Sequence, residues 1–150
     1  MFLQDAITHI NDIGIHYRYK GTSLSQCLVF LHGLASTSRI WDKTIEHLPD
    51  LSVISVDQRG HGETQKPQGD YDFKTFVKDL HCFIESREIS RPVVIGHSWG
   101  GCVAIEYAAQ YPNRIAGLVL LDGGSMISKM NLGLIGRILR SSWRHQTSLE

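Results

Sequence analysis

Short, almost continuously apolar runs recur along the chain and alternate with stretches of helical periodicity. From Phe73 to Ile84, apolar residues return at the spacing of one helix face, which predicts an amphipathic helix capped by Asp72. Apolar runs typical of strands covered on both faces lie at 27–31, 51–56, 92–95 and 115–121. This alternation predicts an α/β fold with a mostly parallel sheet and helices on both faces.

The first part of the chain has a different pattern. Residues 6–10 and 13–19 are expected to form two strands, and Asn11 and Asp12 between them are typical of a hairpin turn. With this hairpin, we expect a sheet of about six strands. One of residues 36–38 is expected to cap a helix. Four histidines on ordinary strand or helix positions are expected to be exposed: His9, His16, His47 and His81.

Composition narrows the classes of function. The chain has 150 residues, and its 15 Lys and Arg balance its 15 Asp and Glu, so charge predicts neither a nucleic-acid nor a membrane partner. Neither a signal peptide nor a transmembrane run is expected. Cys27, Cys82 and Cys102 are widely spaced, which favours reduced thiols and a cytoplasmic location. We expect no metal site and no cofactor, because no residue cluster has metal-ligand spacing.

The strongest chemical signal is Gly96-His97-Ser98-Trp99-Gly100-Gly101. It follows an apolar run and precedes a helical stretch, which is the context in which G-x-S-x-G exposes a serine nucleophile. A serine at so tight a turn takes a strained backbone, and glycine at 96 and 100 leaves room for it. The N–H groups of the following helix suit a developing oxyanion.

Other polar residues follow the ends of other predicted strands. These are His32 with Gly33, Asp57 and Asp122. Ligands of parallel sheets bind outside the carboxyl ends of the strands, so we expect these residues to share one site with Ser98.

Three motifs together resemble the α/β-hydrolase superfamily, most closely its small carboxylesterases, haloperoxidase-like enzymes and carbon–carbon-bond hydrolases. The resemblance implies that Ser98 is the nucleophile and that the backbone N–H groups of Trp99 and Leu34 form the oxyanion hole. It also implies that His32, His61 and His97 brace loops. The motifs are Leu31-His32-Gly33-Leu34, Asp57-Gln58-Arg59-Gly60-His61-Gly62 and Gly96-His97-Ser98-Trp99-Gly100-Gly101. The residues that support the match around the site are His32, Gly33, Gly96, His97 and Gly100.

The rest of the catalytic triad is less well defined. The family order is serine, acid, histidine, and downstream of Ser98 only His145 remains, in a basic tail that matches no family motif. Asp122 is a candidate for the acid, and the alternative is that it caps a loop.

The family sheet has eight strands, whereas six are expected here. The strand ending at Leu121 then becomes an open edge that invites self-association. The chain is therefore expected to be the front part of a longer product, a truncated reading frame, or a half completed by a partner. We assign residues 1–124 to the hydrolase core and 125–150 to the start of a helical cap, or alternatively to a membrane-surface helix.

These observations predict a serine hydrolase that transfers an acyl group to water from a small ester-like substrate through Ser98. The alternative is a catalytically incomplete fragment that only binds a ligand or a partner chain. A phosphate-binding protein is disfavoured, because neither a P-loop nor a dinucleotide fingerprint occurs.

Overall fold

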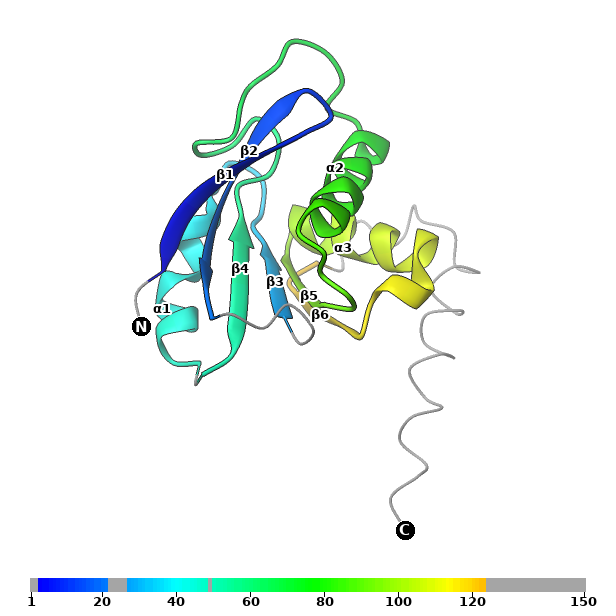
Figure 1. Ribbon diagram of the computed structural model, residues 1–150. Helices are drawn as coiled ribbons and strands as arrows, with labels where there is room; N and C mark the ends of the chain where they lie inside the picture. Colours follow the sequence, from blue (N-terminus) through cyan, green and yellow to red (C-terminus); the bar gives the residue numbers. More distant parts are fainter. Residues whose placement is uncertain (1–2, 22–26, 49, 124–150) are drawn as a thin grey trace.

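The computed structural model describes residues 3–21, 27–48 and 50–123, and over these ranges it forms one sheet with helices on both faces (Figure 1). The expected cap, residues 125–150, and His145 lie outside the described residues. The strand order is β1-β2-β4-β3-β5-β6. The strands are β1 (Gln4–Ile10), β2 (Ile13–Lys20), β3 (Cys27–Leu31), β4 (Ser52–Val56), β5 (Val93–His97) and β6 (Gly117–Leu121).

The pairing of the strands confirms the predicted fold class. β1 and β2 form the antiparallel hairpin, and its turn residues Asn11 and Asp12 have φ of 45° and 62°, as a tight hairpin turn requires. β2 also pairs antiparallel with β4, whereas the pairs β3–β4, β3–β5 and β5–β6 are parallel. The described sheet is therefore six-stranded and mostly parallel.

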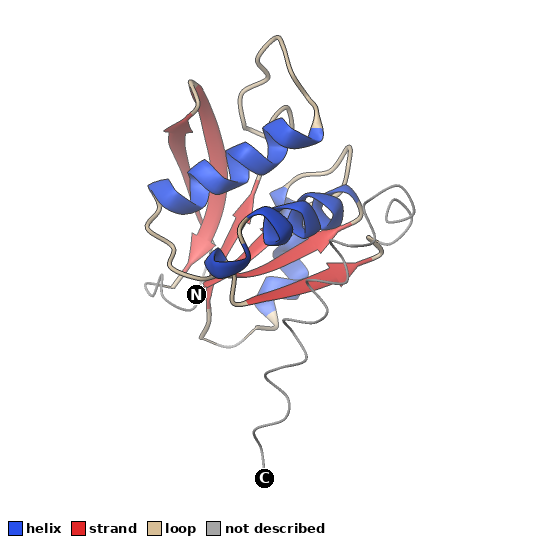
Figure 2. Cartoon of the chain, turned by 90° about the vertical axis from the view of Figure 1, so that its right-hand side faces the viewer, coloured by secondary structure: helices blue, strands red, loops and turns tan. Residues whose placement is uncertain are grey.

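The helices cover the two faces of this sheet. The longer ones, α2 (Phe73–Ser86) and α3 (Trp99–Gln110), lie side by side on one face (Figure 2). Asp72 caps α2 as predicted, since its side chain accepts a hydrogen bond of 2.8 Å from the Thr75 amide. The other face holds η1 (Ser38–Trp41), capped by Thr37, and α1 (Asp42–Glu46); a further short helix, η2 (Pro112–Arg114), precedes β6.

Two apolar cores result from this arrangement. The larger core includes Tyr17 of the hairpin, Phe83 of α2 and Tyr107 of α3. The smaller one, on the other face, joins Phe30 of β3 to Trp41 and Ile45. Both faces of the central strands are thus buried, which explains why their sequences are continuously apolar.

One expectation about histidines is wrong. His9 and His47 are exposed and His81 is half-buried, but His16 on β2 is buried. Its ring makes hydrogen bonds to Asp57, at 2.8 Å, and to Asp5, at 3.1 Å. A polar ring can be buried on this strand because partners distant in sequence meet both of its nitrogens.

β6 is an edge of the described sheet. Val119, Leu120 and Leu121 are 42%, 39% and 43% exposed, respectively. Within the described ranges, no helix is long and apolar enough to cross a membrane.

Candidate active site

Ser98 lies at a sharp bend between β5 and α3. Its backbone has φ of 50° and ψ of −114°, a conformation that residues with a Cβ rarely adopt. The surroundings leave no room for larger neighbours: a Cβ on Gly96 would collide with the carbonyl of Gly100, and a Cβ on Gly100 would lie 2.5 Å from the Leu31 carbonyl oxygen. The bend therefore depends on glycine at both positions.

The loop after β3 lies directly against this bend. A Cβ on Gly33 would lie 2.9 Å from Nδ1 of His97 and 3.3 Å from Cβ of Ser98. Gly33 thus allows the backbone of the loop to approach the serine closely.

The two backbone amides expected to form the oxyanion hole, those of Trp99 and Leu34, have no hydrogen-bond acceptor among the described backbone carbonyls. Trp99 is the first residue of α3, where N–H groups lack partners within the helix. The Leu34 amide makes no hydrogen bond to any described residue. The Leu34 side chain is 67% exposed, while the Trp99 ring stacks on Phe73 at a centroid distance of 4.2 Å and meets Phe76 edge-on.

His32 is fully buried behind this loop. Its Nδ1 donates to the Gly33 carbonyl at 2.8 Å, and its Nε2 accepts from the Gln58 amide at 3.0 Å. Burial lowers the pKa of His32, and repulsion from His61 lowers it further, against the opposing effects of the Gly33 bond and Asp57. The ring is therefore held neutral.

Asp57 ties the loop after β4 to its surroundings. Its carboxylate accepts hydrogen bonds from the amides of Ser38 at 2.5 Å and Glu63 at 3.0 Å, and from His16 at 2.8 Å. Burial alone would raise the pKa of Asp57, but these hydrogen bonds outweigh it and the pKa is lowered. The sequence carried no local signal for this pair, because His16 and Asp57 are 41 residues apart.

The structure places the candidate acid, Asp122, at the same C-terminal end of the parallel strands as Ser98, but pairs it with no base among the described residues. Ser98 N–H donates to Leu121 O at 2.9 Å, so Asp122 follows β6 next to the bend. Asp122 is exposed with φ of 51°, and its carboxylate makes no hydrogen bond or ion pair to the part of the chain that the structure describes. No described histidine side chain bonds to Ser98 either.

Comparison with known proteins identifies the family. The family described as alpha/beta hydrolase fold matches residues 26–140. The chain belongs to this family. Lipase LipV of Mycobacterium tuberculosis is 33% identical over 110 residues, which are 73% of this chain and 42% of LipV. A haloalkane dehalogenase of Mesorhizobium japonicum is 33% identical over 114 residues, 75% of this chain and 37% of that protein.

A solved structure shows the same fold. The crystal structure of a bacterial membrane phospholipase A superposes with a TM-score of 0.76 and 27% identity, over 79% of this chain and 39% of that one. The α/β-hydrolase chain thus spans about two fifths of the length of these relatives.

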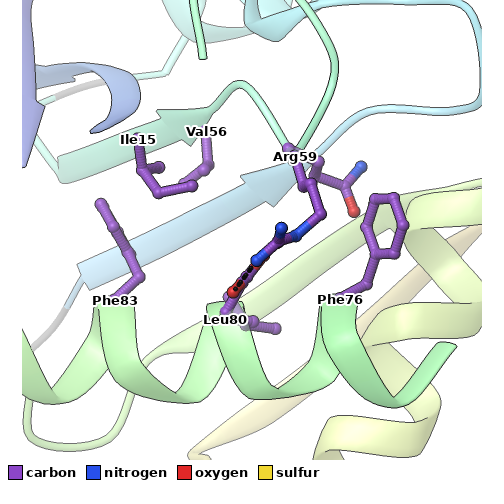
Figure 3. Close-up of a pocket in the computed structure, with 8 residues that line it drawn as sticks. Ile15, Val56, Arg59, Phe76, Leu80 and Phe83 are labelled. Carbon is purple, nitrogen blue, oxygen red and sulfur yellow. Dashed lines mark hydrogen bonds and ion pairs between the residues drawn. The ribbon is translucent and has the colours of Figure 1, made fainter. Parts of the chain in front are cut away.

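A small cavity of about 20 Å³ lies beside the loop after β4 in this α/β-hydrolase chain. Figure 3 shows Arg59 reaching from this loop toward α2, with Phe76, Leu80 and Phe83 on the helix side and Ile15 and Val56 on the strands. Arg59 makes a bidentate ion pair with Asp79, through Nε at 2.7 Å and an η-nitrogen at 3.0 Å. Asn11 also donates to Asp79, at 3.0 Å, so the hairpin turn, α2 and the loop share one buried carboxylate.

Among the described residues, no group of three or more His, Cys, Asp or Glu is placed to hold a metal ion. The buried thiols are also poor ligands in their resting form, because burial raises the pKa of Cys27 to about 12 and raises that of Cys102.

Proposed function

We propose that this chain is the nucleophile-bearing part of a serine hydrolase that transfers an acyl group from a small carboxylic ester to water. The observation that carries the proposal is the strained backbone of Ser98 immediately before α3. The loop residue Gly33 lies close against this serine. A residue keeps such rarely populated φ and ψ angles only where the surrounding structure enforces them, and residues strained in this way are concentrated at functional sites.

The reaction would proceed in two steps. Ser98 Oγ attacks the ester carbonyl, its proton passes to a general base, and the alcohol leaves. Water then attacks the acyl-enzyme and releases the acid. The amides of Leu34 and Trp99 would donate to the oxyanion in both steps. Asp122 is proposed as the acid of the triad because it directly follows β6 beside the bend. No described residue is assigned as the general base.

A fluorophosphonate probe tests the serine directly, with the labelled residue located by mass spectrometry. We expect covalent labelling of the wild type at Ser98, none of Ser98→Ala, and unchanged labelling of Ser90→Ala, which alters an exposed serine away from the bend. Unlabelled wild type, or Ser98→Ala labelled as strongly as wild type, would contradict the proposal.

A second candidate function is binding without catalysis. It is favoured by the open edge of β6 and by the lack of a histidine bonded to Ser98 among the described residues. Hydrolysis of a p-nitrophenyl ester, assayed across gel-filtration fractions, separates the two candidates. Activity in the monomer fraction would remove the binding-only candidate, and an inactive oligomer would support it.

The partner of the site is proposed to be a small ester-like molecule. A cytoplasmic location stays a prediction, for which the three free cysteines, Cys27, Cys82 and Cys102, are the support.

A further inference from the structure

The small cavity between the loop after β4 and α2 has walls of mixed character (Figure 3). Its volume is about 20 Å³, and one water molecule needs roughly 10–15 Å³. The cavity therefore has room for one water and is too small for an ester. Most of its lining residues are apolar, but three are polar, namely Gln58, Arg59 and Asp79.

Gln58 brings to this cavity an oxygen atom without a described partner. The residue is 6% exposed, and its Oε1 is buried without a hydrogen bond to any residue in the described ranges. The Nε2 of the same amide donates to the His32 carbonyl at 2.7 Å, so exchanging the two atoms would place Oε1 against another acceptor. The amide orientation is thus fixed. A buried oxygen of this kind is costly unless a hydrogen bond satisfies it.

The Arg59–Asp79 pair leaves hydrogen-bonding capacity unused among the described residues. Arg59 has five N–H donors, and Nε and one η-nitrogen donate to Asp79, at 2.7 and 3.0 Å. A carboxylate accepts about four hydrogen bonds, and Arg59 and Asn11 together supply three to Asp79. A water could therefore donate to Gln58 Oε1 and to Asp79 while it accepts from Arg59. About three partners are typical of a buried water.

The charges around the cavity exclude other small occupants. A cation would lie against the guanidinium of Arg59, and an anion would lie against the Asp79 carboxylate and Gln58 Oε1. Because the ion pair is formally neutral, the site favours a neutral molecule that both donates and accepts. Cavities that stay dry have apolar walls, which is not the case here.

We propose that this cavity is a binding site for one structural water, which bridges Gln58 Oε1 to the Arg59–Asp79 ion pair. The water joins the loop after β4 to α2 by a contact separate from the ion pair. Asn11 also donates to Asp79, so the water extends a polar network that already includes the hairpin turn. The inference is independent of the proposed function, because no step of it involves Ser98.

NMR cross-peaks between methyl groups and water test the site in the wild-type chain. The methyl groups of Val56 and Leu80 line the cavity and do not exchange protons with solvent. We expect both to show cross-peaks to water with opposite signs in the laboratory and rotating frames, which is the signature of a long-lived bound water. The buried residues Val29 and Val53 lie outside the lining and should show none. Cavity methyls that behave like these control methyls would overturn the proposal.

Filling the cavity distinguishes a hydrated site from a dry one by the sign of the effect on stability. Val56→Ile adds one carbon at the cavity wall. In a dry cavity, that carbon would gain apolar contacts and raise the urea midpoint of unfolding. In the hydrated site, it would displace the water and leave Gln58 Oε1 unpaired. We therefore expect the midpoint to fall by roughly 1 M and the Leu80 cross-peak to water to disappear.

Val29→Ile is the matched control, because it adds the same carbon to a buried valine of the same core outside the cavity. The Leu80 cross-peak to water should persist in this variant. A higher urea midpoint in Val56→Ile, or loss of the cross-peak in both variants alike, would overturn the proposal. If Val56→Ile does not fold, the wild-type spectra decide the question.

Discussion

At the scale of single residues, the conformation of Ser98 separates what function needs from what stability favours. A residue with a Cβ at φ of 50° and ψ of −114° carries strain of about 1–3 kcal/mol. Glycine would relieve that strain, but it has no hydroxyl. The presence of serine at this bend is therefore consistent with a role for its side chain that offsets a loss of stability.

This strain predicts an unusual order of stabilities. Ser98→Gly should be more stable than Ser98→Ala by about 1 kcal/mol, because relief of strain exceeds the extra entropy of an unfolded glycine. Urea unfolding measures the difference. Ser90 has no positive φ, so at that position the glycine variant should be the less stable one. The same order at both positions would show that the bend is not strained.

The residues that the sequence analysis located and those that it missed differ in the range of their interactions. The bend at Ser98 is a local feature, and its glycines lie two residues to either side. His16 depends on Asp57, 41 residues away, so its local pattern gave no reason to expect burial. The histidine that would activate Ser98 was neither located nor missed in this way, because no described histidine side chain bonds to Ser98.

At the scale of elements, polar residues hold the site-bearing loops to the sheet. Asp57 joins the segment that begins η1 to the loop after β4 and to His16 on β2. Arg59 joins the same loop to α2 through Asp79. These buried contacts add to the parallel pairing of β3 with β4, whose last pair, Leu31 with Val56, brings the loops after both strands together.

Asp57 predicts a pH dependence of stability. Its pKa in the folded chain lies below the ordinary value of 3.8, so its contribution is present above about pH 4 and is lost as the pH falls through the folded value. Asp57→Asn should lower the free energy of unfolding at pH 7 by about 1–3 kcal/mol, since an amide nitrogen would face the N–H donors.

The gap between wild type and Asp57→Asn should narrow below about pH 4, as the wild-type carboxylate also becomes protonated. Urea unfolding at a series of pH values measures it. Asp50→Asn, an exposed change, is the control and should show little difference at any pH. A gap that does not vary with pH would mean that charge at Asp57 is not the source of the effect.

The Arg59–Asp79 pair allows a double-mutant test. Asp79→Leu alone leaves a buried guanidinium unpaired and should cost about 3–5 kcal/mol, whereas Arg59→Met with Asp79→Leu should recover most of this loss. Glu85→Ala breaks the exposed ion pair with Arg114 and should cost about 1 kcal/mol or less. Urea unfolding of all variants checks these values, and equal losses in the single and double variants would contradict the prediction.

At the scale of the whole molecule, the two sheet edges differ in character. β1 carries Asp5, which pairs with Arg18 and His16, and charge on an edge strand discourages pairing with another chain. β6 has the sequence GLVLL, without charge or proline. The sequence predicted the edge at Leu121 through the resemblance, because six strands are expected where the family sheet has eight, whereas the strand order itself comes from the structure.

The edge that β6 forms in the described part of the sheet predicts association between copies of this chain, since N–H and C=O groups without a described partner on an apolar strand offer a template for another strand. Sedimentation velocity over a concentration series should show the sedimentation coefficient rising with concentration. Leu120→Lys should reduce this rise, because a charge on an edge strand makes pairing unfavourable. Ile7→Lys is the matched control, since Ile7 is an exposed apolar residue on the opposite edge, and it should leave association unchanged. A wild type that stays monomeric throughout, or two lysine variants with the same effect, would show that β6 is not where copies meet.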